Sequence, residues 1–175
     1  MTTPPAVPLH LHDRPLAGGL VVPWATPVTG AGVALFGTIA EANQHRCLHE
    51  QRCQICGRTL PQSAVLFARQ SDLRLRCTSE PATCPPCADY SAQACPMLSG
   101  ARGTYRTGTH PVLAATPADR LRQGAAAERW FAVHVQQYDV IRHPTLPDTL
   151  AASWRRIPPL RIQPVPAATG RPSTR

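Results

Sequence analysis

The sequence contains no lysine, and all 18 of its basic residues are arginine. With its many alanines and its 20 prolines, this composition is typical of a GC-rich genome, so the pI of about 9.7 says little by itself about a partner. Residues 1–40 carry only Asp13 and Arg14, whereas residues 101–175 carry eleven Arg against four acidic residues. A basic C-terminal half is compatible with nucleic acid or an acidic protein partner, although a solvated Arg-rich surface is the simpler interpretation.

Aromatic residues are also scarce, with three Trp, three Tyr and three Phe in 175 residues. Together with the 20 prolines, this scarcity predicts short elements and much ordered loop instead of a large packed core. A thin core usually needs additional stabilisation, and a bound metal ion is one common form of it.

Long apolar runs are absent. Residues 15–40 are uncharged, but Pro23, Pro27 and five glycines interrupt them, which excludes a transmembrane helix here. The first residues lack a basic stretch followed by an apolar one, so we expect no secretory signal and a cytoplasmic protein without a membrane partner. In the cytoplasm, seven cysteines favour reduced thiols or metal ligands over disulfides.

Four of the cysteines have the spacing C-x₂-C-x₂₇-C-x₂-C, formed by Cys53, Cys56, Cys84 and Cys87. A C-x₂-C pair supplies two thiolate ligands from one tight turn, and two such pairs complete the tetrahedron that Zn²⁺ prefers. Gly57 follows the first pair, where a Cβ would crowd the turn. The second pair begins a predicted helix, whose N-terminus stabilises thiolates. These features predict one structural zinc site.

Two other chemistries are compatible with cysteine pairs. Redox-active dithiols are disfavoured because the first pair lacks the βαβ context of a thioredoxin-like site. An iron–sulfur cluster on Cys77, Cys84, Cys87 and Cys95 would leave the Cys53–Cys56 pair without a role. Cys77 and Cys95 are more simply interpreted as small buried residues. Cys47 and His49 form either a second metal site or, more simply, a helix-surface pair without partners.

The middle of the chain has the pattern of a treble-clef-like zinc domain, with a knuckle, a β-hairpin and a helix in this order. A capping box that starts at Thr38 predicts a helix to about residue 49. Strands at 63–69 and 73–77 are expected to form the hairpin across residues 70–72, because Leu73 and Leu75 alternate with arginines. The helix is predicted at 84–94, with two prolines in its first turn.

The flanks are expected to contribute short strands to a small α+β fold. A strand is predicted at 20–23 with Trp24 as a core anchor, a short helix at 116–123, and strands at 130–140 and 160–163. The resulting organisation is a Pro-rich and loosely attached segment 1–19, a zinc-binding domain 20–99, a linker 100–128, C-terminal strands 129–168 packing on the zinc domain, and a tail 169–175.

Three stretches around the cysteines follow a pattern found elsewhere. Residues 52–57 read R-C-Q-I-C-G, residues 79–90 read S-E-P-A-T-C-P-P-C-A-D-Y, and residues 94–98 read A-C-P-M-L. They resemble the R-L-C-x-x-C-G, S-D-P-P-x-H-x-x-C-A-x-Y and A-C-P-F-L stretches of small uncharacterised proteins from actinobacteria and their phages. The resemblance implies that Cys53, Cys56, Cys84 and Cys87 are the metal ligands. Cys84 stands where that group usually has histidine, which makes the site Cys₄ instead of Cys₃His.

The sequence favours binding over catalysis. Four thiolates leave no open position on a zinc ion, and an HNH-type nuclease needs a histidine base, which residues 57–83 and the following helix lack. We therefore expect a non-enzymatic binding or adaptor protein whose partner is a protein or a nucleic acid. The alternative is a nuclease-derived or other DNA-acting enzyme.

Two sets of residues are candidates for partner contacts. The candidate nucleic-acid contacts are Arg52, Arg58, Arg74 and Arg76. The candidate protein anchors are Trp24, Trp130 and Trp154, for which a core role is the simpler interpretation.

Overall fold

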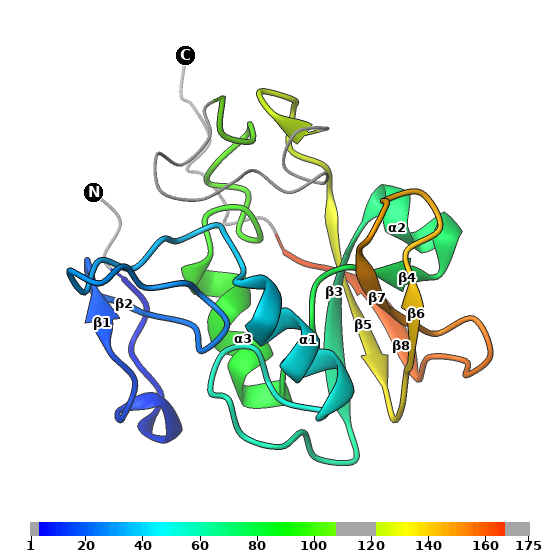
Figure 1. The fold of residues 1–175 in the computed structure, drawn as a ribbon, viewed down its shortest axis with the longest axis horizontal. Coiled ribbons are helices and arrows are strands. Elements are labelled where there is room, and N and C mark those ends of the chain that lie inside the picture. Colours follow the sequence, from blue (N-terminus) through cyan, green and yellow to red (C-terminus); the bar gives the residue numbers. More distant parts are fainter. Residues whose placement is uncertain (1–3, 108–121, 167–175) are drawn as a thin grey trace.

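The computed structural model describes residues 4–107 and 122–166. The described residues form an α+β fold, as the sequence predicts, with one two-stranded and two three-stranded antiparallel sheets (Figure 1). The elements in chain order are a 3₁₀ turn η1 (Leu9–Leu11), β1 (Leu16–Ala17), β2 (Leu20–Val21), α1 (Glu41–His49), β3 (Ala64–Arg69), α2 (Gln70–Leu75), β4 (Cys77–Thr78), α3 (Pro85–Ala94), β5 (Trp130–Val135), β6 (Asp139–Arg142), β7 (Leu150–Ser153) and β8 (Arg161–Pro164).

The central sheet has the strand order β3-β5-β8, and β3 pairs with β5 along its whole length, from Ala64 opposite Val135 to Arg69 opposite Trp130. All six residues of β3 are buried. A continuous apolar run of this kind forms a strand that is covered on both faces. The second sheet, in the order β4-β7-β6, follows β3 through α2.

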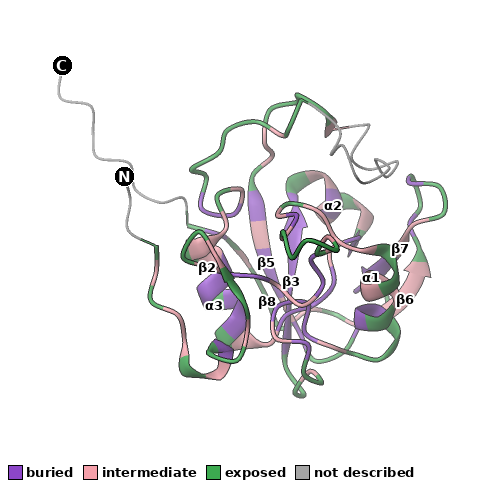
Figure 2. Ribbon diagram, turned by 60° about the vertical axis from the view of Figure 1, so that its left-hand side comes forward, coloured by how far each residue is buried: buried purple, intermediate pink, exposed green. Residues whose placement is uncertain are grey.

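The alternation of side chains along β3 separates two apolar clusters. Leu66 packs on one face with Val133 and Trp154, and the same cluster includes Leu48 of α1. Val65 and Phe67 pack on the other face with Ala88 of α3 and with Trp130. Figure 2 shows the buried positions along β3, β5 and the inner side of α3. The sheet therefore lies between α1 with the second sheet on one side and α3 on the other.

The predicted hairpin of residues 63–69 and 73–77 is wrong. The first strand exists, but residues 70–75 form the helix α2, and β3 pairs instead with the distant β5. The carboxylate of Asp72 accepts the backbone N–H of Arg69 at 2.9 Å, which starts the helix. Arg76 then adopts the left-handed conformation, with φ of 50°, and ends it. The hairpin component of the predicted treble-clef layout is therefore missing.

Other boundaries also differ from the predictions. Helix α1 begins at Glu41 after Ala40, and no side chain caps it, so the capping box at Thr38 is wrong. The predicted strand 130–140 is divided into β5 and β6, which belong to different sheets. The predicted helix 116–123 lies almost wholly outside the described residues. Helix α3 and the last strand are confirmed to within one residue.

The N-terminal segment is not loosely attached where it is described. Leu11 has no exposed surface, and it packs with Val21, Ile55 and Tyr90. Trp24 is only partly buried, whereas Trp130 and Trp154 are core residues with 7% and 1% exposure. In the described ranges, no helix combines the length and the apolar character that crossing a bilayer requires.

Candidate metal centre

The first cysteine pair lies on a tight loop between Arg52 and Thr59, which form an isolated β-bridge. Within the loop, the N–H of Cys53 donates to the carbonyl of Arg58, and the N–H of Gly57 donates to the carbonyl of Cys53, both at 2.8 Å. Gly57 has a φ of +75°, which a residue with a side chain rarely adopts. The loop thus has the compact form that brings two sulfurs of one C-x₂-C pair together. We call residues 52–59 the knuckle.

The chain at residues 24 and 25 covers the knuckle. The N–H groups of Trp24 and Ala25 donate to the carbonyls of Ile55 and Gln54 at 2.9 and 3.0 Å. The indole of Trp24 is so close to Gly57 that a Cβ there would lie 2.5 Å from its Cδ1. Position 57 therefore requires glycine for two reasons: the conformation of the turn and the space that the indole occupies.

The second cysteine pair is positioned by the start of α3. Cys84 is the residue before the helix, Pro85 and Pro86 occupy its first positions, and Cys87 lies in its first turn. Proline is suited to these positions because the first N–H groups of a helix have no intrahelical partner. Thr83 fixes the entry, since it exchanges two backbone hydrogen bonds of 2.9 Å with Val65 of β3.

Gln54 joins the two pairs. Its backbone N–H donates to the carbonyl of Ala82 at 3.0 Å, and its side-chain Nε2 donates to the carbonyl of Pro81 at 2.7 Å. The side chain is buried, where such bonds are costly to lose. Sequence reasoning missed this residue, because a glutamine between two cysteines has no pattern that distinguishes it from a solvated one.

All four sulfurs meet at one point. The Sγ atoms of Cys53, Cys56, Cys84 and Cys87 lie within 4.8 Å of one another. A tetrahedral Zn²⁺ with bonds of about 2.3 Å requires sulfur–sulfur distances of about 3.8 Å, which lie within this limit. Cys53 and Cys87 are buried and the other two are partly buried. The four cysteines could therefore hold a metal ion in a shielded position.

The thiols perturb one another strongly. Hydrogen bonding with Cys53 lowers the pKa of Cys84 to about 7 and that of Cys56 well below the range of a free thiol. Cys56 raises the pKa of Cys53, and Cys53 raises that of Cys87. The cluster thus keeps some protons when no cation is bound, because four thiolates this close repel one another. A divalent cation would remove that repulsion and allow all four to ionise.

The remaining cysteines lie outside this cluster. Cys47 has no exposed surface, and burial raises its pKa to about 12. It is therefore not part of a helix-surface pair, since His49 alone faces solvent. Burial also raises the pKa of Cys77 and of Cys95, as expected for structural thiols. The cysteines that converge with Cys84 and Cys87 are Cys53 and Cys56. The iron–sulfur alternative required Cys77 and Cys95 in their place.

The four candidate nucleic-acid contacts do not form one patch. Arg52 bonds to Glu50 at 2.6 Å and to the carbonyl of Gly57 at 3.1 Å, beside the knuckle. Arg58, on the same loop, lies 3.9 Å from Asp13. Arg74 and Arg76 are exposed on and after α2, on the opposite side of the molecule from β1 and β2 (Figure 1).

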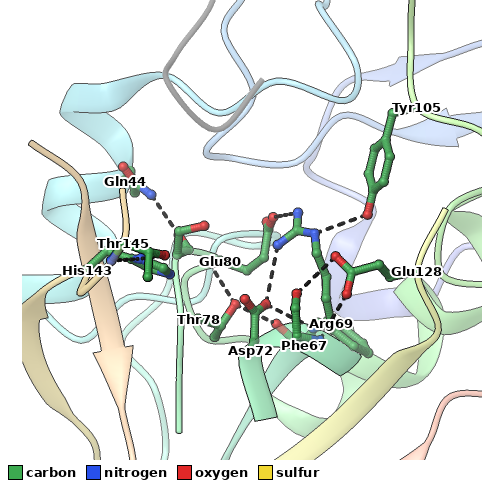
Figure 3. A network of polar contacts seen from close by, with 12 residues as sticks. Gln44, Phe67, Arg69, Asp72, Thr78, Glu80, Tyr105, Glu128, His143 and Thr145 are labelled. Carbon is green, nitrogen blue, oxygen red and sulfur yellow. Dashed lines mark hydrogen bonds and ion pairs between the residues drawn. The ribbon is translucent and has the colours of Figure 1, made fainter. Parts of the chain in front are cut away.

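A buried ion-pair network is a further feature that the sequence did not indicate. Arg69, only 5% exposed, donates to Glu80 at 2.6 Å, lies 3.5 Å from Asp72, and has its guanidinium 4.3 Å from the ring centre of Trp130. Figure 3 shows Glu80 and Asp72 converging on Arg69, and the hydroxyl of Tyr105 reaches the same guanidinium. Every charged group in this network has a partner, so its arrangement is structural.

One histidine reaches the metal centre. The Nε2 atom of His10 lies 3.2 Å from the Sγ of Cys87. His10 lies in the Pro-rich segment 1–19, which is predicted from the sequence to be loosely attached. A histidine 77 positions away along the chain offers no spacing signal that could have linked it to the cysteines.

The chain matches no protein-family model, no curated protein and no solved structure.

Proposed function

We propose that Cys53, Cys56, Cys84 and Cys87 bind one Zn²⁺ and that this ion is structural. The observation that carries the proposal is the convergence of the four sulfurs within 4.8 Å. Four thiolates at tetrahedral corners suit Zn²⁺ better than Mg²⁺ or Ca²⁺, which prefer oxygen ligands. The knuckle and the first turn of α3 supply the ligands as in a treble-clef finger, with β3 and its bridge to Thr83 in place of the hairpin.

The function that this site supports is binding, not catalysis. A zinc ion with four thiolate ligands has no position left for a water or a substrate. The nuclease alternative needs a histidine base next to a hydrolytic metal, but residues 57–83 and α3 contain no histidine. His10, which does reach the site, contacts the sulfur of Cys87.

Metal analysis tests the zinc proposal directly. The purified chain is expected to contain about one equivalent of zinc, and the double variant Cys53→Ser, Cys56→Ser less than about half of one. Cys95→Ala is the matched control, because this thiol is half-buried and outside the cluster. Less than half an equivalent in the parent, or unchanged zinc and folding in the double variant, would contradict the proposal.

Nucleic acid is the partner that we propose to test first. Arg74 and Arg76 are exposed, and Arg155 lies beside them because its side chain donates to the carbonyl of Leu75 at 2.8 Å. Neighbouring arginines without acidic partners are the groups that bind phosphates. No ion pair involves Arg74, Arg76 or Arg155 in the part of the chain that the structure describes.

A gel-shift titration separates this surface from the knuckle arginines. We expect binding to DNA or RNA at low salt that weakens steeply as salt rises, and a weaker affinity for Arg74→Gln, Arg76→Gln. The matched variant Arg52→Gln, Arg58→Gln removes the same charge beside the knuckle, where both arginines face acids. Absence of binding at low salt would exclude a nucleic-acid partner, and an equal loss in both variants would exclude the surface at α2.

A further inference from the structure

His10 contacts the metal centre from a segment that contributes no metal ligand. It belongs to the 3₁₀ turn η1, and its ring reaches Cys87 in the first turn of α3. The contact joins Nε2 and Sγ at 3.2 Å, within the range of a hydrogen bond to sulfur, and is partly buried. Among the described residues, this is the only hydrogen bond between an imidazole and a cysteine sulfur.

Among the hydrogen bonds of the described residues, the contact of His10 with Cys87 is the one that reaches a sulfur of the cluster from outside the knuckle and the start of α3. A four-thiolate site carries −2 with Zn²⁺ bound, and an N–H donor compensates part of this negative charge. The imidazole of His10 is placed to be such a donor for Cys87.

The chemistry of the contact fixes which atom donates. A metal-bound thiolate only accepts hydrogen bonds, so Nε2 must carry the proton in the zinc-bound protein. Second-shell donors of this kind orient the ligand and adjust how strongly it binds and reacts. A thiolate without its donor is the more nucleophilic one.

The chain that follows His10 is anchored at two points. Leu11, the next residue, is completely buried against Tyr90 and Cys87. Further along the segment, the N–H of Val21 donates to the hydroxyl of Tyr90 at 3.0 Å. Both anchors lead to α3, the helix that carries Cys87.

We propose that His10 is a positioning residue of the metal centre, whose Nε2–H donates to the Cys87 thiolate and couples zinc binding to the docking of residues 4–25. The inference rests on the proposed zinc site and adds a fifth residue to it. The zinc site then connects three separate parts of the chain. The knuckle and α3 supply the ligands, and residues 4–25 are connected to it through His10.

The test compares His10→Ala with His10→Gln, because the glutamine amide places an N–H near the former Nε2. His12→Ala is the control, since His12 is exposed and its Nε2 bonds only to the carbonyl of Val7 in the described part of the chain. Zinc affinity is measured by competition with a chromogenic chelator. Alkylation of the zinc-loaded chains by N-ethylmaleimide is followed by mass spectrometry at each cysteine. The Co²⁺-substituted chains report on the thiolates through their sulfur-to-metal charge-transfer band.

We expect His10→Ala to bind zinc about tenfold more weakly, a loss typical of a second-shell partner. Cys87 should become the fastest-alkylated ligand, and the charge-transfer band should shift. His10→Gln should recover most of each change, and His12→Ala should match the parent. If the parent binds zinc and His10→Ala equals it in all three measurements, the proposal for His10 is wrong while the zinc site stands. If the parent binds no zinc, both proposals are wrong.

Discussion

At the scale of single residues, Gly57 connects the backbone geometry of the knuckle to the packing around it. Its positive φ allows the turn that brings Cys53 and Cys56 together, and its missing side chain leaves room for the indole of Trp24. That indole also lies 5.1 Å from the guanidinium of Arg46, which fixes it against α1. The absence of a side chain at position 57 therefore permits both the turn of the knuckle and the packing of Trp24 against it.

We expect Gly57→Ala to reduce the free energy of unfolding by about 2 kcal/mol or more, because left-handed backbone and an indole at 2.5 Å both oppose a Cβ. Urea unfolding monitored by Trp fluorescence and zinc content measures the effect. Gly103→Ala is the matched control, since its Cβ would meet nothing within 4 Å. A stability equal to that of the control would contradict the role of Gly57.

His143 is a second residue whose environment has a measurable consequence. It is 8% exposed, and its Nδ1 accepts the N–H groups of Thr145 and Leu146 at 3.3 and 3.2 Å (Figure 3). Its Nε2 has no partner in the described part of the chain. Burial lowers its pKa, and of the nearby charges Asp72 opposes this shift while Arg122, Arg69 and Arg155 add to it. Folding therefore favours the neutral ring.

Because the pKa of His143 is lower in the folded chain than in the unfolded one, the unfolded chain takes up this proton first as the pH falls. The stability that the neutral ring contributes is complete above the unfolded pKa of about 6.5 and is lost below it. We expect the unfolding free energy to fall more for the parent than for His143→Asn between about pH 7.5 and 6, measured by urea unfolding. Equal losses in both chains would show that His143 does not titrate on unfolding.

At the scale of elements, α2 shows why a local sequence pattern can predict the wrong secondary structure. Leu73 and Leu75 are two positions apart, which fits a strand, but six residues are too few to distinguish that period from one and a half helical turns. The deciding contact joins the Asp72 carboxylate to Arg69, and the buried Arg69 in turn needs Glu80. A helix that depends on a buried ion pair from outside its own sequence cannot be predicted from propensity.

We expect Asp72→Ala to destabilise the fold by about 2–4 kcal/mol, because it removes the acceptor of the Arg69 backbone N–H and one partner of a buried guanidinium. Thermal and urea unfolding of the variant measure the loss. Asp13→Ala, which removes an aspartate that is 93% exposed at its side chain, should leave the stability unchanged. A similar small effect for both would mean that the buried network contributes little.

The elements that could be predicted are those with a local cause. Helix α3 follows from two prolines and an N-terminal cysteine, and the convergence of the cysteine pairs follows from ligand chemistry and spacing. The pairing of β3 with β5 and the contact of His10 with Cys87 have no local cause, since each joins residues more than sixty positions apart. Gln54 belongs to the same class, because its role depends on carbonyl groups that only the fold brings to it.

At the scale of the whole molecule, the metal centre and the sheets stabilise different parts. Two apolar clusters are centred on β3 and contain none of the four cysteines. The third cluster is built around the cysteines with Leu11, Val21, Ile55 and Tyr90. A chain with few aromatic residues thus divides its core. The part around the cysteines has only the two-stranded β1–β2 sheet beside it, so we expect it to depend on the site for its stability.

This division predicts a stepwise response to metal removal. Structural zinc contributes on the order of 10 kcal/mol in small domains, so a chelator should release the third cluster before the other two. Hydrogen exchange followed by mass spectrometry should show loss of protection in residues 9–25 and 52–60 of the metal-free chain. Residues 64–69 and 130–135 should keep most of theirs, because β3 and β5 pair along their whole length and are covered by Leu48 and Trp154. Simultaneous loss in all four ranges would instead mean that the sheets also need the metal to fold.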